Sequence, residues 1–258
     1  MQVNVASQQR LDKLLVERGL APTRSSAQQQ IAAGLVSVDG TPVEKAGFLV
    51  ARDQAIEVMS AASPAFVGRG GQKLSAALDR WNIQLAGKTC LDVGISTGGF
   101  TDCMLRRGAA RVVGIDSGHG QLSSALRDEP RLRLLERTNA RHLTAAALPE
   151  TIDFFAMDVS FIAASLVLLA VIASAFRPLE DRPQALMREA VVLVKPQFEA
   201  GREFVGKRGI VRSVTAHRLA VERVRDTVKA LGAQEPDVID SPIEGGDGNR
   251  EFLLYARF

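Results

Sequence analysis

From about residue 90 onward, the chain alternates short, almost wholly apolar runs with longer segments of helical periodicity. Short apolar runs are typical of strands buried on both faces of a sheet, and helical segments between them provide the crossovers that parallel strands need. The pattern predicts an α/β fold with a mostly parallel sheet. The predicted strands are Cys90–Val93, Val112–Ile115, Leu132–Leu135, Phe154–Met157 and Val191–Val194, with Val238–Ile239 and Phe252–Tyr255 following late in the chain.

The N-terminal part of the chain follows a different pattern. Two short helices are expected at Arg10–Arg18 and Ser25–Ala33, with Gly34 ending the second. The dipeptide Asp39-Gly40 accepts the positive φ angles of a tight turn and therefore predicts a hairpin. The hairpin strands are Val36–Val38 and Thr41–Val43, and Ile56–Val58 is a further strand. The uncharged segment Ala61–Pro64 contains a breaker, so we expect one domain over residues 8–62 and a second over 63–258.

A glycine-rich turn directly follows the first strand of the second domain. It contains Gly94, Ser96, Gly98, Gly99 and Phe100. Glycine lets the backbone approach a ligand closely, and Asp116 ends the next strand, where a carboxylate can accept hydrogen bonds from both hydroxyls of a ribose. Together these features predict a cofactor that contains a nucleoside. The glycines alone would equally suit a tight connection that binds nothing.

The spacing of the glycines indicates which nucleoside cofactor fits. In the dinucleotide fingerprint a single residue separates the first two glycines, whereas three residues separate Gly94 from Gly98. Asp92, on the strand itself, would repel a pyrophosphate but suits the charged amino acid end of S-adenosylmethionine. The sequence therefore favours S-adenosylmethionine over NAD.

Four ionisable residues stand where chain geometry could bring them together. Asp158 and Lys195 each follow a predicted parallel strand, so both should emerge at the carboxyl edge of the sheet, where ligand crevices form. Glu251 precedes the last strand, which begins at the same edge if it is antiparallel, as we expect. Lys73 is predicted to open a helix over Lys73–Trp81. The alternative is that each side chain forms an ordinary surface ion pair.

Such a cluster suits the transfer of a methyl group to a hydroxyl. The hydroxyl oxygen must be held in line with the methyl group and relieved of its proton, which requires positioning and one base. A lysine acts as that base only if its pKa is lowered, and two neighbouring ammonium groups, Lys73 and Lys195, would lower each other's pKa. Asp158 and Glu251 would orient the ammonium groups. No metal ion is needed.

The charge balance is a weak guide to the partner. Lys and Arg number 32 and Asp and Glu 29, and this net charge of +3 suggests a polyanionic partner without marking a strongly basic binder. Residues 1–62 carry six basic and six acidic side chains, so a nucleic-acid-binding face there would need segregated charges. Cys90 and Cys103 lack metal-ligand spacing and no secretory signal is visible, which together favour the cytoplasm.

One segment has the length of a candidate membrane span. Val159–Phe176 carries no charged residue. Its serines and many alanines, and the strands predicted on both sides of it, favour a buried connecting helix instead. We therefore expect no stable membrane association.

Six motifs are spread over nearly the whole chain. They are Arg69–Leu74 (RGGQKL), Asp92–Asp102 (DVGISTGGFTD), Glu136–Asn139 (ERTN), Asp158–Ile162 (DVSFI), Val194–Glu199 (VKPQFE) and Gly248–Leu253 (GNREFL). Together they resemble the TlyA, or haemolysin A, type of ribosomal RNA 2′-O-methyltransferase. The resemblance implies a Rossmann-like methyltransferase sheet and S-adenosylmethionine-dependent methylation of ribose in ribosomal RNA, with cytidines of 16S or 23S RNA as targets.

The catalytic domain also resembles the FtsJ-type ribose methyltransferases. Their set of lysine, aspartate, lysine and glutamate corresponds to Lys73, Asp158, Lys195 and Glu251. By this resemblance Lys195 is the base. The resemblance further implies that Asn139 contacts the adenosine part of the cofactor.

The segment from Arg10 to about Val58 resembles the α-L RNA-binding motif named after a small-subunit ribosomal protein. This resemblance implies contacts to RNA phosphates, which position a substrate without reading its sequence. The expected contacts are Arg10, Lys13, Arg18 and Arg24, with Arg69 of the second domain as a further one. A solvated helix face is the alternative for each. The expected partner is ribosomal RNA or a ribosomal subunit, and the sequence predicts no oligomeric state.

Two other functions are compatible with parts of the sequence. One is a ribosome-assembly factor that binds RNA and keeps the cofactor pocket without turnover, which the complete set of four ionisable residues disfavours. The other is a membrane-active haemolysin that inserts Val159–Phe176, which the lack of a convincing membrane helix in the sequence disfavours. Arg177–Ala190 is longer than is usual for the family and is expected to form a loop beside the active site.

Overall fold

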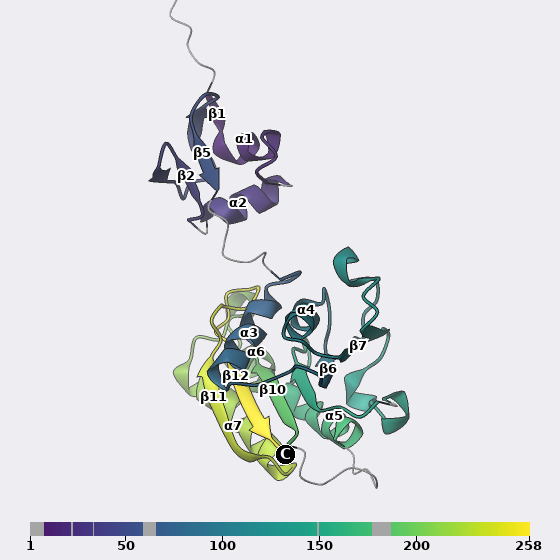
Figure 1. Ribbon diagram of the computed structural model, residues 1–258. Helices are drawn as coiled ribbons and strands as arrows, with labels where there is room; N and C mark the ends of the chain where they lie inside the picture. The colour runs from purple at the N-terminus through teal and green to yellow at the C-terminus, as the bar shows by residue number, and fades with distance from the viewer. Residues whose placement is uncertain (1–7, 22, 33, 59–65, 149, 177–186) are drawn as a thin grey trace, which may run out of the picture. The chain divides into compact units, whose positions relative to one another are not determined.

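The chain divides into two compact units, Met1–Ala65 and Phe66–Phe258 (Figure 1). The computed structural model describes residues 8–21, 23–32, 34–58, 66–148, 150–176 and 187–258. The boundary expected between residues 62 and 63 falls within 59–65, outside the described residues. Each unit has its own hydrophobic core, as expected for independently packed domains.

The N-terminal unit packs two helices against small antiparallel sheets. Its elements are β1 (Gln8–Arg10), α1 (Leu11–Glu17), α2 (Arg24–Ala32), β2 (Val36–Val38), β3 (Thr41–Pro42), β4 (Leu49–Ala51) and β5 (Ile56–Val58). β1 pairs with β4, and β2 pairs with both β3 and β5. Asp39 and Gly40 have φ angles of 48° and 75°, which confirms the predicted tight turn. Leu11, Leu15 and Ile31 are fully buried between the helices and the sheets.

A seven-stranded sheet organises the second unit. Its strands are β6 (Thr89–Val93), β7 (Arg111–Ile115), β8 (Leu132–Leu135), β9 (Phe154–Met157), β10 (Glu189–Val194), β11 (Gln234–Asp240) and β12 (Phe252–Arg257). Their order in space is β11-β12-β10-β9-β6-β7-β8. The five strands from β10 to β8 are parallel, and β12 runs antiparallel to both of its neighbours. The predicted α/β fold with an antiparallel last strand is confirmed.

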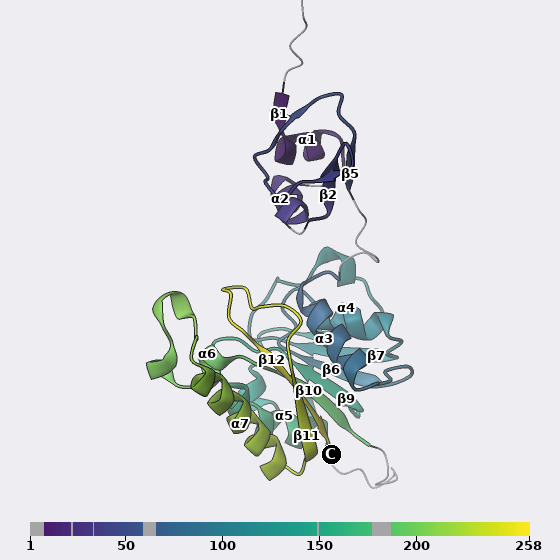
Figure 2. The ribbon, with the colours of Figure 1, turned by 90° about the vertical axis from the view of Figure 1, so that its left-hand side faces the viewer.

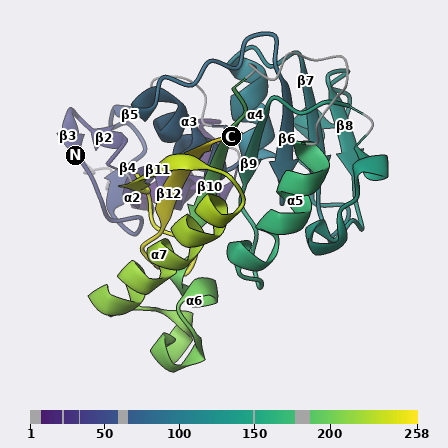
Figure 3. The ribbon, with the colours of Figure 1, turned by 90° about the horizontal axis from the view of Figure 1, so that it is seen from below.

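Helices cover both faces of this sheet. They are α3 (Gly70–Arg80), α4 (Gly99–Arg106), α5 (Leu168–Ala175), α6 (Pro196–Glu199) and α7 (Val214–Ala230), with short 3-10 helices at Ser124–Leu126, Ala140–His142, Ala145–Ala147, Ala164–Leu166, Arg202–Phe204 and Lys207–Gly209. α3 and α4 lie on one face, and α5 and α7 on the other (Figures 2 and 3). Phe154 packs in the same cluster as Leu74 of α3, and Phe155 in the same cluster as Val171 of α5. This double burial explains why the strands read as continuous apolar runs.

The start of α3 differs from the sequence expectation. The helix begins at Gly70, so Lys73 lies within its first turn and does not open it. Glycine has a low helix propensity, which hid the first turn from the sequence analysis. Packing explains the presence of glycine in this turn, because a Cβ atom at Gly71 would lie 2.2 Å from the ring of Phe66.

The segment Val159–Phe176 is not one long helix. It contains the 3-10 turn Ala164–Leu166 and then α5, which has eight residues and buries Leu168 and Val171. A connecting helix is therefore present, but it is shorter than the uncharged run. Among the described residues, no helix has both the length and the apolar character needed to cross a membrane. Residues 177–186 of the expected loop lie outside the described residues, and its end, Glu189–Ala190, already belongs to β10.

Candidate functional site

The turn between β6 and α4 brings distant segments of the chain into close contact. Gly94 has a φ angle of 90°, and a Cβ atom there would lie 2.3 Å from the backbone oxygen of Asp158. A Cβ atom at Gly99 would lie 3.0 Å from the backbone oxygen of Gly68. Gly94 needs to be glycine because of its positive φ angle and its close contact with the Asp158 backbone. Glycine at position 99 lets the start of α4 come close to the start of α3.

The carboxylate of Asp116 is held at the end of β7 by two backbone N–H groups. Ser96 N donates to its Oδ2 over 2.8 Å, and Gly118 N donates to its Oδ1 over 2.7 Å. A carboxylate oxygen has two lone pairs, so each oxygen can accept a further hydrogen bond from a ligand hydroxyl. Gly98 completes the turn as the residue before α4, with a φ angle of 95°.

Asp92 lies beneath the turn and not on its surface. Its side chain is fully buried, its Oδ2 accepts a hydrogen bond of 2.7 Å from the Thr101 hydroxyl, and its Oδ1 has no hydrogen-bond partner. Burial raises the pKa of this carboxyl to about 7, against the opposing effect of the Thr101 hydrogen bond. A direct contact between Asp92 and the cofactor stays a prediction.

A cavity of about 320 Å³ opens beside the turn. Its lining includes four residues expected to bind the cofactor, namely Gly94, Ser96, Asp116 and Asn139. Gln121 and Phe161 are among the lining residues that were not predicted from the sequence to bind the cofactor. Gln121 accepts a hydrogen bond of 3.2 Å from the Ser96 hydroxyl, and no motif marked it. Phe161 is 93% exposed, and its place in the Asp158–Ile162 motif was the available signal.

A second cavity, of about 270 Å³, adjoins the first. Both cavities are lined by Gly94, Ser96, Asp158 and Ser160. The second brings together all four ionisable residues identified from the sequence, and its lining also includes Arg69, Gly99 and Phe100. The four are Lys73, Asp158, Lys195 and Glu251.

The sheet topology explains this convergence. β9 and β10 are neighbouring parallel strands, so Asp158 and Lys195, which follow them, emerge side by side at the same edge. β12 is antiparallel to β10 and pairs Phe252 with Val194, so Glu251 enters the sheet at that edge. Lys73 reaches the same cavity from the first turn of α3.

Two lysine–carboxylate pairs line the second cavity. Lys73 Nζ lies 2.5 Å from Glu251 Oε2, and these side chains are 9% and 3% exposed. Lys195 Nζ lies 2.6 Å from Asp158 Oδ1 and donates a hydrogen bond of 2.7 Å to Ser160 Oγ. The side chains of Lys195 and Asp158 are 11% and 23% exposed. Each ammonium group is compensated by its own carboxylate, and the Lys195–Asp158 pair is the more open to solvent.

Comparison with known proteins places this geometry in a family. Residues 66–258 match the FtsJ-like methyltransferase family, and residues 9–56 match the S4 domain. The 16S/23S rRNA (cytidine-2′-O)-methyltransferase TlyA of Mycobacterium tuberculosis is 42% identical over 253 residues, which cover 98% of this chain and 91% of the relative. The chain belongs to the TlyA family of FtsJ-like methyltransferases.

Two further relatives, both named as hemolysins, cover nearly the whole chain. Hemolysin A of Brachyspira hyodysenteriae is 36% identical over 247 residues, which cover 95% of this chain and 98% of the relative. A solved structure from Streptococcus thermophilus superposes with a TM-score of 0.70 at 36% identity and covers 98% of this chain and 89% of that one. The family resemblance inferred from the six motifs is confirmed.

The cofactor of this TlyA-family enzyme is S-adenosylmethionine. The crevice formed by the two cavities fits this molecule. The Gly94 backbone lines both cavities, and the fixed Asp116 carboxylate can accept hydrogen bonds from ribose hydroxyls. The same crevice extends to the lysine–carboxylate pairs, because the two cavities share lining residues.

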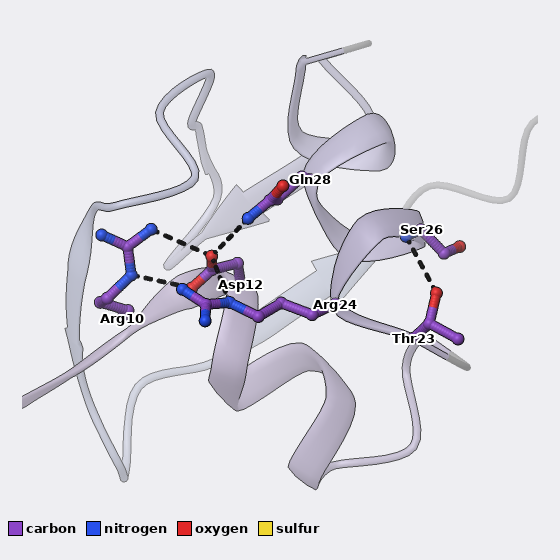
Figure 4. Close-up of polar contacts among 6 residues, drawn as sticks. All are labelled: Arg10, Asp12, Thr23, Arg24, Ser26 and Gln28. Atoms are coloured by element: carbon purple, nitrogen blue, oxygen red, sulfur yellow. Dashed lines mark hydrogen bonds and ion pairs between the residues drawn. The ribbon is translucent and has the colours of Figure 1, made fainter.

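In the S4 domain, the expected RNA contacts fall into two groups. Arg10 and Arg24 converge on Asp12, a buried carboxylate that the sequence analysis did not identify (Figure 4). Arg18 instead donates hydrogen bonds to two backbone oxygens, those of Arg52 and Gln54, and Lys13 is exposed. Contact of these four basic residues with RNA stays a prediction.

We expect Gly94→Ala to abolish most cofactor binding. The new methyl group would strain the positive φ angle and collide with the backbone oxygen of Asp158, which would move the ends of β6 and β9 apart. Calorimetry should show an affinity for S-adenosylmethionine reduced by about tenfold or more, since the loss of a close backbone approach typically costs more than about 1.4 kcal/mol. Gly87→Ala is the matched control, because Gly87 has a φ angle of 76° with nothing within 4 Å of its Cβ position. If Gly94→Ala and Gly87→Ala bind S-adenosylmethionine with equal affinity, the close contact between Gly94 and the Asp158 backbone is not needed for cofactor binding.

We also expect the stability of the cofactor-free protein to depend on pH through Asp92. The folded-state pKa of about 7 lies above the usual value near 4, so the folded state binds the proton more tightly. The contribution of Asp92 is therefore fully present below about pH 4 and is lost as pH rises through about 7, by at most about 1.4 kcal/mol per pH unit. Urea unfolding between about pH 5 and 8 should show the wild type losing stability relative to Asp92→Asn. If the difference in stability between the wild type and Asp92→Asn does not change over this pH range, the buried Asp92 carboxyl is ionised throughout the range.

Proposed function

We propose that this protein transfers the methyl group of S-adenosylmethionine to a ribose 2′-hydroxyl of ribosomal RNA. The observation that carries the proposal is the presence of two lysine–carboxylate pairs in a cavity that adjoins the cofactor crevice. Methylation of a hydroxyl requires a proton acceptor and a fixed approach of the oxygen, and this cavity offers both. The cytidine-2′-O specificity named for the Mycobacterium tuberculosis relative supports cytidines of 16S or 23S RNA as targets.

Lys195 is the proposed base. S-Adenosylmethionine supplies an electrophilic methyl group whose bonding electrons remain on the sulfur. In its uncharged form, Lys195 Nζ accepts the proton of the 2′-hydroxyl as the ribose oxygen bonds to that methyl group. Asp158 and Ser160 hold Nζ at 2.6 Å and 2.7 Å and so limit the directions from which it can accept a proton. Asp158 then stabilises the ammonium group that the transfer produces.

The Lys73–Glu251 pair has a positioning role in this proposal. Both side chains are almost completely buried, and the pair as a whole carries no net charge. It therefore forms a fixed polar wall of the cavity. Because Glu251 compensates the charge of Lys73, the direct repulsion between two ammonium groups that was expected from the sequence is reduced. The proposed cofactor contacts are Asp92, Gly94, Ser96, Gly98, Gly99, Phe100, Asp116 and Asn139, with Asp92 acting from beneath the turn.

RNA capture is assigned to the S4 domain and to Arg69. Arg69 is exposed and lines the cavity of the lysine–carboxylate pairs, where a phosphate next to the target ribose would lie. Arg10, Lys13, Arg18 and Arg24 are the proposed phosphate contacts of the S4 domain. The proposed substrate is ribosomal RNA, free or within a ribosomal subunit, and a substrate of this kind supports a cytoplasmic location.

The Lys195→Ala variant tests the proposed base. Incorporation of labelled methyl groups into ribosomal RNA should fall by about 10²–10⁴-fold, the usual contribution of a general base. Affinity for S-adenosylmethionine should change little, because removal of the ammonium leaves the glycine turn and Asp116 intact. The modified product should resist alkaline cleavage at the methylated nucleotide, since a methylated 2′-oxygen cannot attack the neighbouring phosphate.

Lys88→Ala is the matched control for this experiment. Lys88 also forms a lysine–carboxylate pair, with Glu189 at 2.7 Å, but it does not line either cavity. Its loss should leave methyl incorporation unchanged. Normal incorporation by Lys195→Ala would remove Lys195 as the base, and a wild type that binds RNA and cofactor without any methyl transfer would favour a ribosome-assembly factor.

A further inference from the structure

We propose that Asp12 is a positioning residue that fixes Arg10 and Arg24 as a preformed clamp for phosphates of structured RNA. The proposal rests on the RNA-binding function proposed for the S4 domain and adds the group that organises it. Figure 4 shows both guanidinium groups and the Gln28 amide pointing toward the Asp12 carboxylate.

The Asp12 carboxylate accepts four hydrogen bonds. Arg10 donates from Nε to Oδ1 over 3.1 Å and from Nη2 to Oδ2 over 3.0 Å, which is a two-pronged contact. Arg24 Nε and Gln28 Nε2 donate to Oδ2 over 3.0 Å and 2.9 Å. The Asp12 side chain is 0% exposed. Its hydrogen bonds with Arg10 hold the pKa of this carboxyl well below its usual range, so it stays ionised at any physiological pH.

The two arginines keep donors for a ligand. A guanidinium group has five N–H donors, and Asp12 uses two of those on Arg10 and one of those on Arg24. The Arg10 and Arg24 side chains are 43% and 51% exposed, so their remaining donors can reach solvent. Arg18 provides a contrast, because both of its terminal nitrogens bind backbone oxygens of the same domain.

The cluster contains more charge than helix packing requires. Asp12 lies in the first turn of α1, and Gln28 lies in α2, so the hydrogen bond from the uncharged Gln28 amide to the carboxylate already ties the two helices together. The arginines add two half-exposed positive charges around a single negative one, which leaves the cluster with a net charge of +1. An anionic partner uses this surplus charge, and the planar forks of two guanidinium groups match phosphate oxygens.

Fixing the arginines should favour a structured RNA over an arbitrary one. A free arginine side chain loses rotamer freedom when it binds a phosphate, whereas Arg10 and Arg24 are already held on Asp12. The fixed clamp gains affinity only where the phosphates of the RNA have a matching spacing. The negative charge of Asp12 also reduces the general attraction to any polyanion, which lowers non-specific binding.

The Asp12→Asn variant of the full chain separates positioning from charge. Binding should be measured against unmethylated ribosomal subunits and against an unrelated duplex RNA. Affinity for the subunits should fall about tenfold, because the amide cannot hold two guanidinium groups. Affinity for the unrelated duplex should stay equal or rise, because a negative charge has been removed. The KM for ribosomal RNA should rise with kcat unchanged, and cofactor affinity should not change.

Asp39→Asn is the matched control. It removes the same charge from the same domain, at an exposed hairpin turn where Asp39 binds Gln54 and Ala55 N. It should not reduce the preference for ribosomal subunits. If both Asn variants change the two affinities in parallel, Asp12 contributes only charge and the proposal is wrong.

A second variant covers the case in which Asp12→Asn does not fold. The double variant Arg10→Lys, Arg24→Lys keeps Asp12 and both positive charges but cannot form the forked contacts. It should lose the preference for ribosomal subunits while keeping its affinity for the unrelated duplex, and an unchanged preference would overturn the proposal. If the wild type itself shows no preference, the proposed RNA substrate fails together with the clamp. If the wild type prefers ribosomal subunits and the variants keep that preference, the clamp is rejected and the proposed RNA substrate is not.

Discussion

The contact between Gly94 and the backbone of Asp158 controls the geometry of the whole site. Asp158 N donates a hydrogen bond of 2.9 Å to the backbone oxygen of Val93, so the ends of β6 and β9 are locked together. Glycine at position 94 then lets the two chains approach closely enough for both residues to line both cavities. The Asp158 side chain extends from this backbone contact and forms an ion pair with Lys195. The backbone therefore fixes the position of Asp158 beside the cofactor crevice, and the side chains of Asp158 and Ser160 hold the proposed base.

Carboxylates orient cations in both units of the protein. In the catalytic unit each lysine has its own carboxylate, and the more exposed pair, Lys195–Asp158, is the one that a substrate can reach. In the S4 domain one carboxylate, Asp12, serves two arginines and leaves a surplus positive charge at the surface. The difference matches the proposed tasks, because the carboxylate beside Lys195 stabilises the ammonium group that forms when this lysine accepts a proton, whereas a phosphate clamp needs uncompensated positive charge.

Much of the fold and of the site could be predicted from the sequence because both depend on local pattern and sheet topology. Strands buried on both faces appear as apolar runs, and the carboxyl-edge rule then places Asp158 and Lys195 side by side. The rest depends on tertiary contacts. The first turn of α3 contains two glycines, and the close packing of Gly71 against Phe66, which explains one of them, cannot be seen in the sequence. Asp12 reads as an ordinary acidic residue in the first turn of a helix, and its burial appears only when α2 is packed against α1.

The arrangement of charge in the S4 domain is compatible with the proposed selective binding of RNA by a nearly neutral segment. Residues 1–62 contain equal numbers of basic and acidic side chains, so this segment has little long-range attraction for polyanions. Several basic side chains are already occupied within the domain, since Arg52 pairs with Glu17 and Arg18 binds backbone oxygens. In the proposed clamp, RNA affinity comes from a few guanidinium groups held in fixed directions. Non-specific RNA competes through charge alone, so a domain of this kind binds the wrong RNA weakly. Its affinity is higher for an RNA whose phosphates match the positions of the guanidinium groups.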